Sequence, residues 1–246
     1  MIEQEIEIPM LEGSADGVFF RPEGPGGWPG VIHLADIHGV RAAHRDKAKR
    51  LAEEGYAVLL PNVFYRAGRS PVWSFRFTMG EERSVKRMQE ITAPLTPEAM
   101  ESDAASYVSF LARQPGVSPG PMGILGHCYT GGMALRAAAA CPDRIAAMAS
   151  FHGGNLATGS PTSPHLVLPR VRARLYFGHA GEDRSMPAEA IARLEAALTA
   201  WGGRYESETY DDARHGWTVE DSAAWNADLA RRAFEKLTAL FAGTLR

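Results

Sequence analysis

Short apolar runs alternate with longer amphipathic stretches along most of the chain. The runs are too short for helices and predict strands at 30–35, 56–60, 122–126, 145–151, 174–177 and 205–210. The stretches between and after them predict helices at 41–54, 97–113, 129–140, 187–200 and 222–241. This alternation is typical of an α/β protein with a mostly parallel central sheet and helices on both of its faces.

Two parts of the chain depart from that alternation. Residues 3–9 and 17–21 predict a pair of antiparallel edge strands joined by a glycine-containing turn. Residues 62–96 are interrupted by Pro71, Gly80 and Pro94, and they are too many for an ordinary connection. We expect them to form a lid or cap over a site. Because no repeat or linker is visible, residues 1–246 are interpreted as a single domain.

Composition and charge exclude several classes of protein. The 246 residues include 26 Lys and Arg against 29 Asp and Glu, and a net charge of -3 argues against binding to nucleic acid or to an anionic membrane. The acidic, alternating start of the chain is unlike a signal peptide, and no stretch approaches the ~18 apolar residues of a membrane span. We therefore expect a cytoplasmic protein, either a monomer or a small homo-oligomer.

The most informative segment is 122–132, MGILGHCYTGG, in which a buried strand meets an alanine-rich helix at Cys128. Such a turn presents its central side chain at the carboxyl edge of the sheet, and the helix N-terminus stabilises a thiolate there. A free cysteine is more often a small core residue. The glycines around this one, Gly126 and Gly131-Gly132, favour a nucleophile instead. Cys141, at a helix end with no acid or base nearby, is predicted to be structural.

The turn from Gly126 to Gly132 resembles the nucleophile elbow of the dienelactone hydrolase family, a branch of the α/β-hydrolases that uses cysteine where most relatives use serine. Thr130 departs from the pattern, because glycine is usual at that position. The resemblance spans nearly the whole chain in the order of its elements. It implies an α/β-hydrolase fold in which Cys128 is the nucleophile.

In this fold the catalytic acid and then the histidine follow the nucleophile along the chain. Residues 178–187, GHAGEDRSMP, resemble the acid loop of the family and imply that Asp183 is the acid. Glu182 is the competing carboxylate, and either side chain could simply cap the next helix. Residues 210–217, YDDARHGW, resemble the histidine loop and imply that His215 is the base, oriented by Asp183.

Acyl transfer also requires two N–H donors for the developing oxyanion. One is expected from Tyr129, the residue after the nucleophile, and the resemblance implies that Ile37 supplies the other. Asp36 stands where the family carries a glutamate that couples thiol ionisation to substrate binding. The carboxylate of Asp36 is one methylene shorter, and its alternative role is to cap the helix that begins near Arg41.

Candidate substrate contacts are less clearly marked. Family members that act on small anionic lactones have a serine directly after the catalytic histidine and an arginine a few positions later, and this chain has neither. His152 at a strand end, Arg76 in the 62–96 segment and Trp217 are the candidates for the pocket wall. Basic and aromatic residues in loops are, however, more often plain surface or packing residues.

A metal or cofactor is not expected. His33, Asp36, His38 and His44 are close in sequence, but they lie on a strand and a turn and lack the helical spacing of a zinc site. The leading hypothesis is hydrolysis of a small lactone or carboxylic ester. The alternatives are a thioesterase or other acyl hydrolase with the same three residues and, in a different class, a non-catalytic protein that binds a small ligand.

Overall fold

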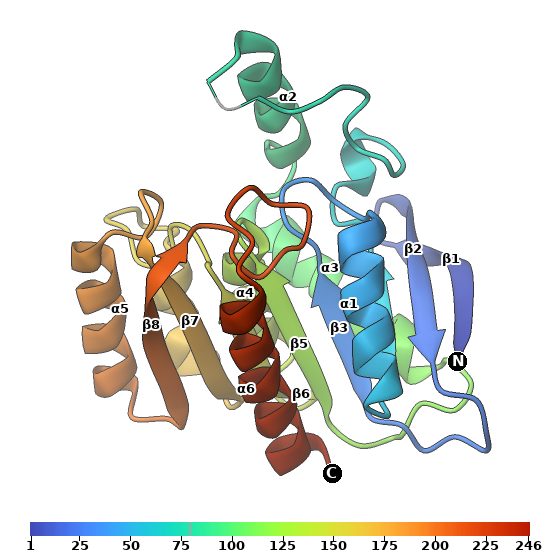
Figure 1. The fold of residues 1–246 in the computed structure, drawn as a ribbon. Helices are drawn as coiled ribbons and strands as arrows, with labels where there is room; N and C mark the ends of the chain where they lie inside the picture. Colours follow the sequence, from blue (N-terminus) through green and yellow to red (C-terminus); the bar gives the residue numbers. More distant parts are fainter. Residues whose placement is uncertain (79) are drawn as a thin grey trace.

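The computed structural model describes residues 1–78 and 80–246, whose strands form one eight-stranded sheet (Figure 1). The strand order is β1-β2-β4-β3-β5-β6-β7-β8. The strands are β1 (Ile2–Met10), β2 (Gly13–Arg21), β3 (Gly30–Leu34), β4 (Ala57–Pro61), β5 (Met122–His127), β6 (Ile145–Phe151), β7 (Arg174–Glu182) and β8 (Tyr205–Arg214). The helices are α1 (Ala42–Glu53), α2 (Glu82–Thr92), α3 (Pro97–Ala112), α4 (Thr130–Ala140), α5 (Ala188–Trp201) and α6 (Ala227–Leu245).

The sheet is parallel from β4 to β8 and antiparallel where β1, β2 and β4 meet. The predicted antiparallel pair is present, but only β1 lies at the edge, because β2 also pairs with β4. All carboxyl ends of the parallel strands therefore lie along one edge of the sheet, which is where α/β enzymes bind ligands. The predicted α/β-hydrolase fold class is confirmed.

Helices cover both faces of the sheet and bury two separate apolar cores. On one face α1 and α6 pack against the sheet through residues such as Leu51, Leu237 and Phe241. On the other face α3, α4 and α5 contribute residues such as Leu111 and Leu194. Two buried faces explain why the central strands are continuous apolar runs rather than alternating ones. No helix in the described ranges is long and apolar enough to cross a membrane.

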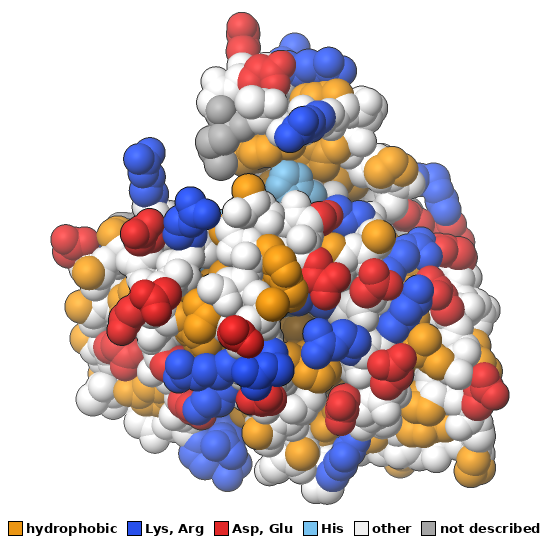
Figure 2. Space-filling view, in the orientation of Figure 1, with side chains coloured by type: hydrophobic (Ala, Val, Ile, Leu, Met, Phe, Trp, Pro, Cys, Tyr) orange, Lys and Arg blue, Asp and Glu red, His pale blue; other side chains and the backbone are white. Residues whose placement is uncertain are grey.

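The 62–96 segment is more regular than its sequence predicts. It contains a short 3₁₀ turn, η1 (Tyr65–Ala67), and then α2, which begins after Gly80 and ends before Pro94. The two breakers thus flank a helix instead of interrupting one. In Figure 1, α2 stands above the carboxyl ends of the strands, and Figure 2 shows hydrophobic side chains on the side of this projection that faces the sheet.

Three further differences affect the ends of elements. Strand β7 continues five residues past its predicted end, to Glu182, and β8 continues four residues past its own, to Arg214, so Asp183 and His215 each follow a strand directly. Helix α6 begins at Ala227 and not at 222, because the side chain of Asn226 caps it by accepting a hydrogen bond from the amide of Leu229. A second 3₁₀ helix, η2 (Pro164–Arg170), was not predicted.

Candidate active site

The turn between β5 and α4 is tightly constrained around Cys128. Cys128 has a φ of 56°, a left-handed conformation that is rare outside glycine and is typical of strained functional turns. A Cβ atom on Gly126 would lie 2.2 Å from the carbonyl oxygen of Thr130, and one on Gly131 would lie 2.4 Å from Oγ of Ser150. Both positions therefore require glycine, and together they turn the cysteine outward at the strand end.

Thr130, the departure from the family pattern, has a structural role that glycine cannot fill. Its buried hydroxyl accepts a hydrogen bond from the amide of His127 at 3.0 Å. The same hydroxyl lies 3.1 Å from the carbonyl oxygen of Leu34 and 3.0 Å from that of His127, to which it can donate. The hydroxyl thus joins the end of β3 to the end of β5, the strands that precede the 36–40 loop and Cys128.

His215 lies between Cys128 and Asp183. Its Nδ1 atom is 2.6 Å from Oδ2 of Asp183, and its side chain also interacts with Cys128, which lines the same cavity. The other oxygen of Asp183 accepts hydrogen bonds from the hydroxyl of Ser185 at 2.6 Å and from its amide at 2.8 Å. The Asp183 side chain is 2% exposed, whereas the competing Glu182 is exposed to solvent. The sequence did not reveal the part played by Ser185, although Asp-x-Ser is a common turn in which the side chain hydrogen-bonds two residues on.

Electrostatics in this group favour a charged imidazole. Burial by itself lowers the pKa of His215, but hydrogen bonds and charge interactions with Asp183 and Cys128 outweigh burial and raise the pKa to about 10. Burial likewise raises the pKa of Asp183, but the hydrogen bonds from His215 and Ser185 reverse this and leave it below its ordinary value. The arrangement therefore favours an imidazolium ion beside the Asp183 carboxylate.

The two expected oxyanion donors lie beside the thiol. Ile37 and Tyr129 line the same cavity as Cys128. Within residues 1–78 and 80–246, neither backbone amide donates to a protein acceptor. Trp73 holds the loop that contains Ile37, because its Nε1 atom donates a hydrogen bond to the carbonyl oxygen of Ile37 at 3.0 Å.

Asp36 differs from both roles expected of it. Two nitrogens of Arg41 bind its carboxylate at 2.7 and 2.9 Å, and the amide of His38 donates to it at 2.8 Å. His44, whose Nε2 atom lies 3.3 Å from the carboxylate, and the Arg41 guanidinium together hold the pKa of Asp36 well below its ordinary value in spite of burial. The carboxylate is thus paired with Arg41 and His44 and is not free to act as a thiol gate. It does not cap α1 either, since that helix has no side-chain cap.

Arg41 extends this connection across the site. Its guanidinium also binds both oxygens of Asp221, at 2.7 and 2.9 Å. The residue therefore joins the loop after β3 to the segment that follows His215. Arg41 is 22% exposed, so this bridge is only partly screened by solvent.

A cavity of about 860 Å³ opens beside the cysteine. Its wall combines side chains of the 62–96 segment with the α3, α4, β7 and β8 regions of the body. Large apolar members are Phe77, Met88, Leu95, Met100, Tyr129 and Met133. Charged members are Arg136, Glu182, Asp183, Arg184 and Arg214. Arg136 was not predicted to line the cavity, because this residue lies in an otherwise apolar helix.

The three predicted substrate contacts lie outside this wall. His152 is 1% exposed, and its ring packs edge-on against that of His215 at 5.1 Å. Trp217 is fully buried and packs against His152 and Tyr210. The ring of His152 therefore packs directly against His215, and Trp217 packs against His152. Arg76 is exposed on the 62–96 segment and is not among the residues that line the cavity.

Comparisons with known proteins agree with this architecture. The dienelactone hydrolase family matches residues 15–245. A protein of Synechocystis sp. named "Putative carboxymethylenebutenolidase" is 28% identical over 244 residues, which cover 98% of this chain and 96% of the relative. The carboxymethylenebutenolidase of Rhodococcus opacus is 28% identical over 211 residues, which cover 85% of this chain and 75% of that protein.

Solved structures show the same fold. A Klebsiella pneumoniae protein described as "Putative Dienelactone Hydrolase" superposes with a TM-score of 0.86 at 24% identity, and the match covers 98% of both chains. An acylaminoacyl peptidase of Pyrococcus horikoshii superposes with a TM-score of 0.72 at 15% identity, over 99% of this chain but only 42% of its own. With a family match over nearly its full length, this chain is a hydrolase that belongs to the dienelactone hydrolase family.

Proposed function

We propose that the protein hydrolyses a lactone or carboxylic ester through Cys128, His215 and Asp183. The observation that carries this proposal is the 2.6 Å hydrogen bond between Asp183 and His215, whose ring also interacts with Cys128, at a strained strand–helix turn that opens into a large cavity. Nucleophile, base and orienting acid in this arrangement are the parts that covalent acyl transfer needs.

In the first half-reaction the thiolate of Cys128 attacks the substrate carbonyl carbon. The carbonyl oxygen takes the negative charge and is stabilised by the amides of Ile37 and Tyr129. When the intermediate collapses, the C–O bond of the ester breaks, and His215 gives its proton to the departing alkoxide. The products are an alcohol, still tethered if the substrate is a lactone, and a thioester on the cysteine.

In the second half-reaction the now neutral His215 takes a proton from water, which attacks the thioester carbonyl. The same two amides stabilise the second oxyanion. Its collapse releases the carboxylic acid and restores the thiolate–imidazolium pair. Asp183 keeps one ring nitrogen of His215 protonated throughout, so that the other faces the reaction.

The cavity suggests the kind of substrate. A volume of about 860 Å³ falls within the range of pockets for drug-sized ligands, and its wall is largely apolar. The residue after His215 is Gly216, and the next, Trp217, is buried, so no side chain there offers a charge to a substrate carboxylate. We therefore propose a lactone or ester with an apolar portion, covered by residues 62–96 as the lid of a single domain.

A substrate panel with two cysteine variants tests the proposal. Cys128→Ala is expected to abolish turnover of p-nitrophenyl acetate, p-nitrophenyl butyrate and simple lactones with no loss of folded protein by circular dichroism. Cys141→Ala is the matched control and is expected to retain turnover, because Cys141 lies at the far end of α4. Unchanged hydrolysis in Cys128→Ala contradicts the proposal.

Thioester and amide substrates in the same panel separate the alternatives. Faster turnover of thioesters than of esters would identify a thioesterase with the same three residues. A wild-type protein that binds these compounds but hydrolyses none of them would be a ligand-binding member of the fold.

A further inference from the structure

Three buried histidines meet behind the nucleophile turn. His33 comes from β3, His44 from α1 and His127 from β5, and each is at most 2% exposed. Their ring centroids form a nearly equilateral triangle with sides of 5.1, 5.2 and 5.2 Å. One ring nitrogen from each residue can be chosen so that all three lie within 4.8 Å of one another.

The hydrogen bonds of the rings indicate which nitrogens face inward. Nε2 of His44 lies 3.3 Å from the Asp36 carboxylate and also accepts a hydrogen bond from the amide of Asp36 at 3.3 Å, and Nδ1 of His127 lies 3.2 Å from the hydroxyl of Thr218. Metal binding would move the ring proton of His44 from Nδ1 to Nε2, where it faces the carboxylate. Nδ1 of His44 lies 3.0 Å from Nε2 of His33. Nε2 of His127 is buried and has no hydrogen-bond partner in the described part of the chain.

We propose that His33, His44 and His127 form a binding site for a divalent transition metal ion of the zinc class. Zinc bound by imidazoles at 2.0–2.1 Å in a tetrahedron has its ligand nitrogens about 3.3 Å apart. The inward nitrogens of His33 and His44 are already near that spacing at 3.0 Å. A shift of up to about 1.5 Å by the third ring would complete three of four tetrahedral positions.

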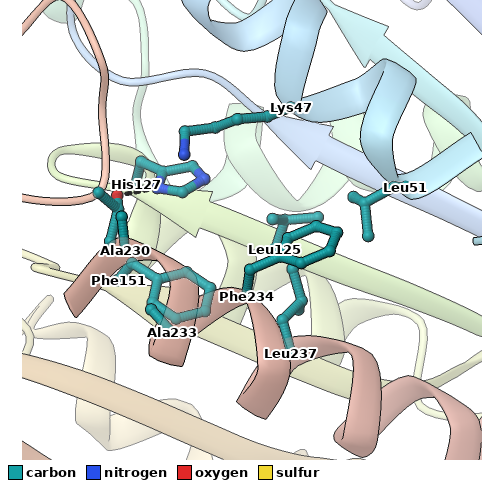
Figure 3. A pocket seen from close by; sticks show the side chains of 10 residues that line it. Lys47, Leu51, Leu125, His127, Phe151, Ala230, Ala233, Phe234 and Leu237 are labelled. Carbon is teal, nitrogen blue, oxygen red and sulfur yellow. Dashed lines mark hydrogen bonds between the residues drawn. The ribbon is translucent and has the colours of Figure 1, made fainter. Parts of the chain in front are cut away.

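The surroundings of the three rings also fit a metal site. A histidine ligand usually holds its second nitrogen against a carboxylate or another acceptor, as His44 does with Asp36 and His127 with Thr218. Beside His127 is a small cavity of about 20 Å³, enough for one water molecule, which is lined by His127 but by neither His33 nor His44. Figure 3 shows the amine of Lys47 directed toward the His127 ring at this cavity.

The sequence alone argued against this site, because His33 and His44 lack the helical spacing of zinc ligands. Its third member comes from β5, far along the chain from the other two, so no ligand spacing is visible in the sequence. Bound metal would connect β3, α1 and β5, which carry the 36–40 loop and the nucleophile turn. The metal ion is therefore assigned a structural role, in which it stabilises these elements. This inference does not depend on the proposed hydrolysis.

The test is a titration of tag-free, chelator-treated protein with Co²⁺, followed by displacement with Zn²⁺. The titration uses the Cys128→Ala background, because the pair of Cys128 and His215 can itself bind a soft metal ion. We expect the visible absorption of tetrahedral Co²⁺ to saturate at one ion per chain, and mass spectrometry of the native protein to show one Zn²⁺ after exchange.

Two histidine variants complete the design. In the same background, His33→Gln is expected to abolish the absorption band and the rise in Tm that Zn²⁺ produces. His179→Gln is the matched control, since His179 is equally buried but lies on β7, outside the triangle. If His33→Gln does not fold, His44→Gln replaces it. Absence of the Co²⁺ band in the Cys128→Ala protein, or its survival in a folded His33→Gln protein, overturns the proposal.

Discussion

Replacement of Asp183 by asparagine is expected to slow ester hydrolysis by about 10²–10⁴-fold at pH 7. Raising the pKa of His215 from 6.5 to about 10 corresponds to about 5 kcal/mol of preference for the imidazolium. Asp183 and Cys128 both contribute to this preference, so about half of it, ~2–3 kcal/mol, is assigned to the carboxylate. Loss of the carboxylate's share of this free energy accounts for a ~10²-fold decrease in the rate of hydrolysis.

The amide adds a second defect because its NH₂ group can donate to Nδ1 of His215. That hydrogen bond favours the tautomer with its proton on the nitrogen that should face the thiol, and this error takes the loss toward ~10⁴-fold. The fold should be preserved, since asparagine has the same shape and can still accept from the amide and hydroxyl of Ser185.

The assay is kcat/KM for p-nitrophenyl butyrate, with folded protein checked by circular dichroism. Glu182→Gln is the control, because it neutralises the adjacent carboxylate, which is exposed and lies on the cavity wall. We expect that variant to stay within ~5-fold of wild type. The reasoning is refuted if the kcat/KM of Asp183→Asn stays within 10-fold of the wild-type value. It is also refuted if Glu182→Gln loses more activity than Asp183→Asn loses.

Three further predictions concern stability. Thr130→Val is expected to lower the unfolding free energy by about 2–3 kcal/mol, because it leaves buried backbone groups without a partner, whereas Thr130→Ser should lose much less; urea denaturation measures both. Gly126→Ala should cost about 1–3 kcal/mol from its 2.2 Å contact, while Gly159→Ala, with nothing within 4 Å, should stay within about 0.5 kcal/mol. The pKa of His215 is raised to about 10, so the stability it contributes is fully present below about pH 6.5 and is lost as the pH rises through about 10. The difference in unfolding free energy between wild type and His215→Gln should therefore shrink over that interval, and a difference that grows with pH contradicts this assignment.

The sequence predicted most of the sheet because buried strands are short apolar runs between turn residues. It also indicated Cys128, Asp183 and His215, since the fold requires them in that order after particular strands. Helix α2 was missed because Gly80 and Pro94 were interpreted as interruptions, although both lie outside it. Residues that end a helix and residues that prevent one are the same types, so composition alone could not decide.

Side-chain direction was the part that the sequence could not supply. His152 has a φ of 41°, a backbone conformation that no strand periodicity predicts, and its ring packs behind His215 and not into the cavity. Asp36 was expected to face the thiol, but Arg41, five residues later, binds it instead. Each outcome depends on a neighbour brought in by the fold.

The bridge from Asp36 through Arg41 to Asp221 has a consequence for how the molecule becomes active. Arg41 and Asp221 are 180 positions apart, so this contact closes nearly the whole chain into one loop. Such distant contacts form late in folding, because the entropy of closing the loop must be overcome before they contribute any stability. The loop after β3 and the segment after His215 should therefore come together only when the last strand and α6 are in place. A partly synthesised or partly refolded chain would hold most of its secondary structure and still lack activity, which makes the recovery of ester hydrolysis a reporter for the final step of folding.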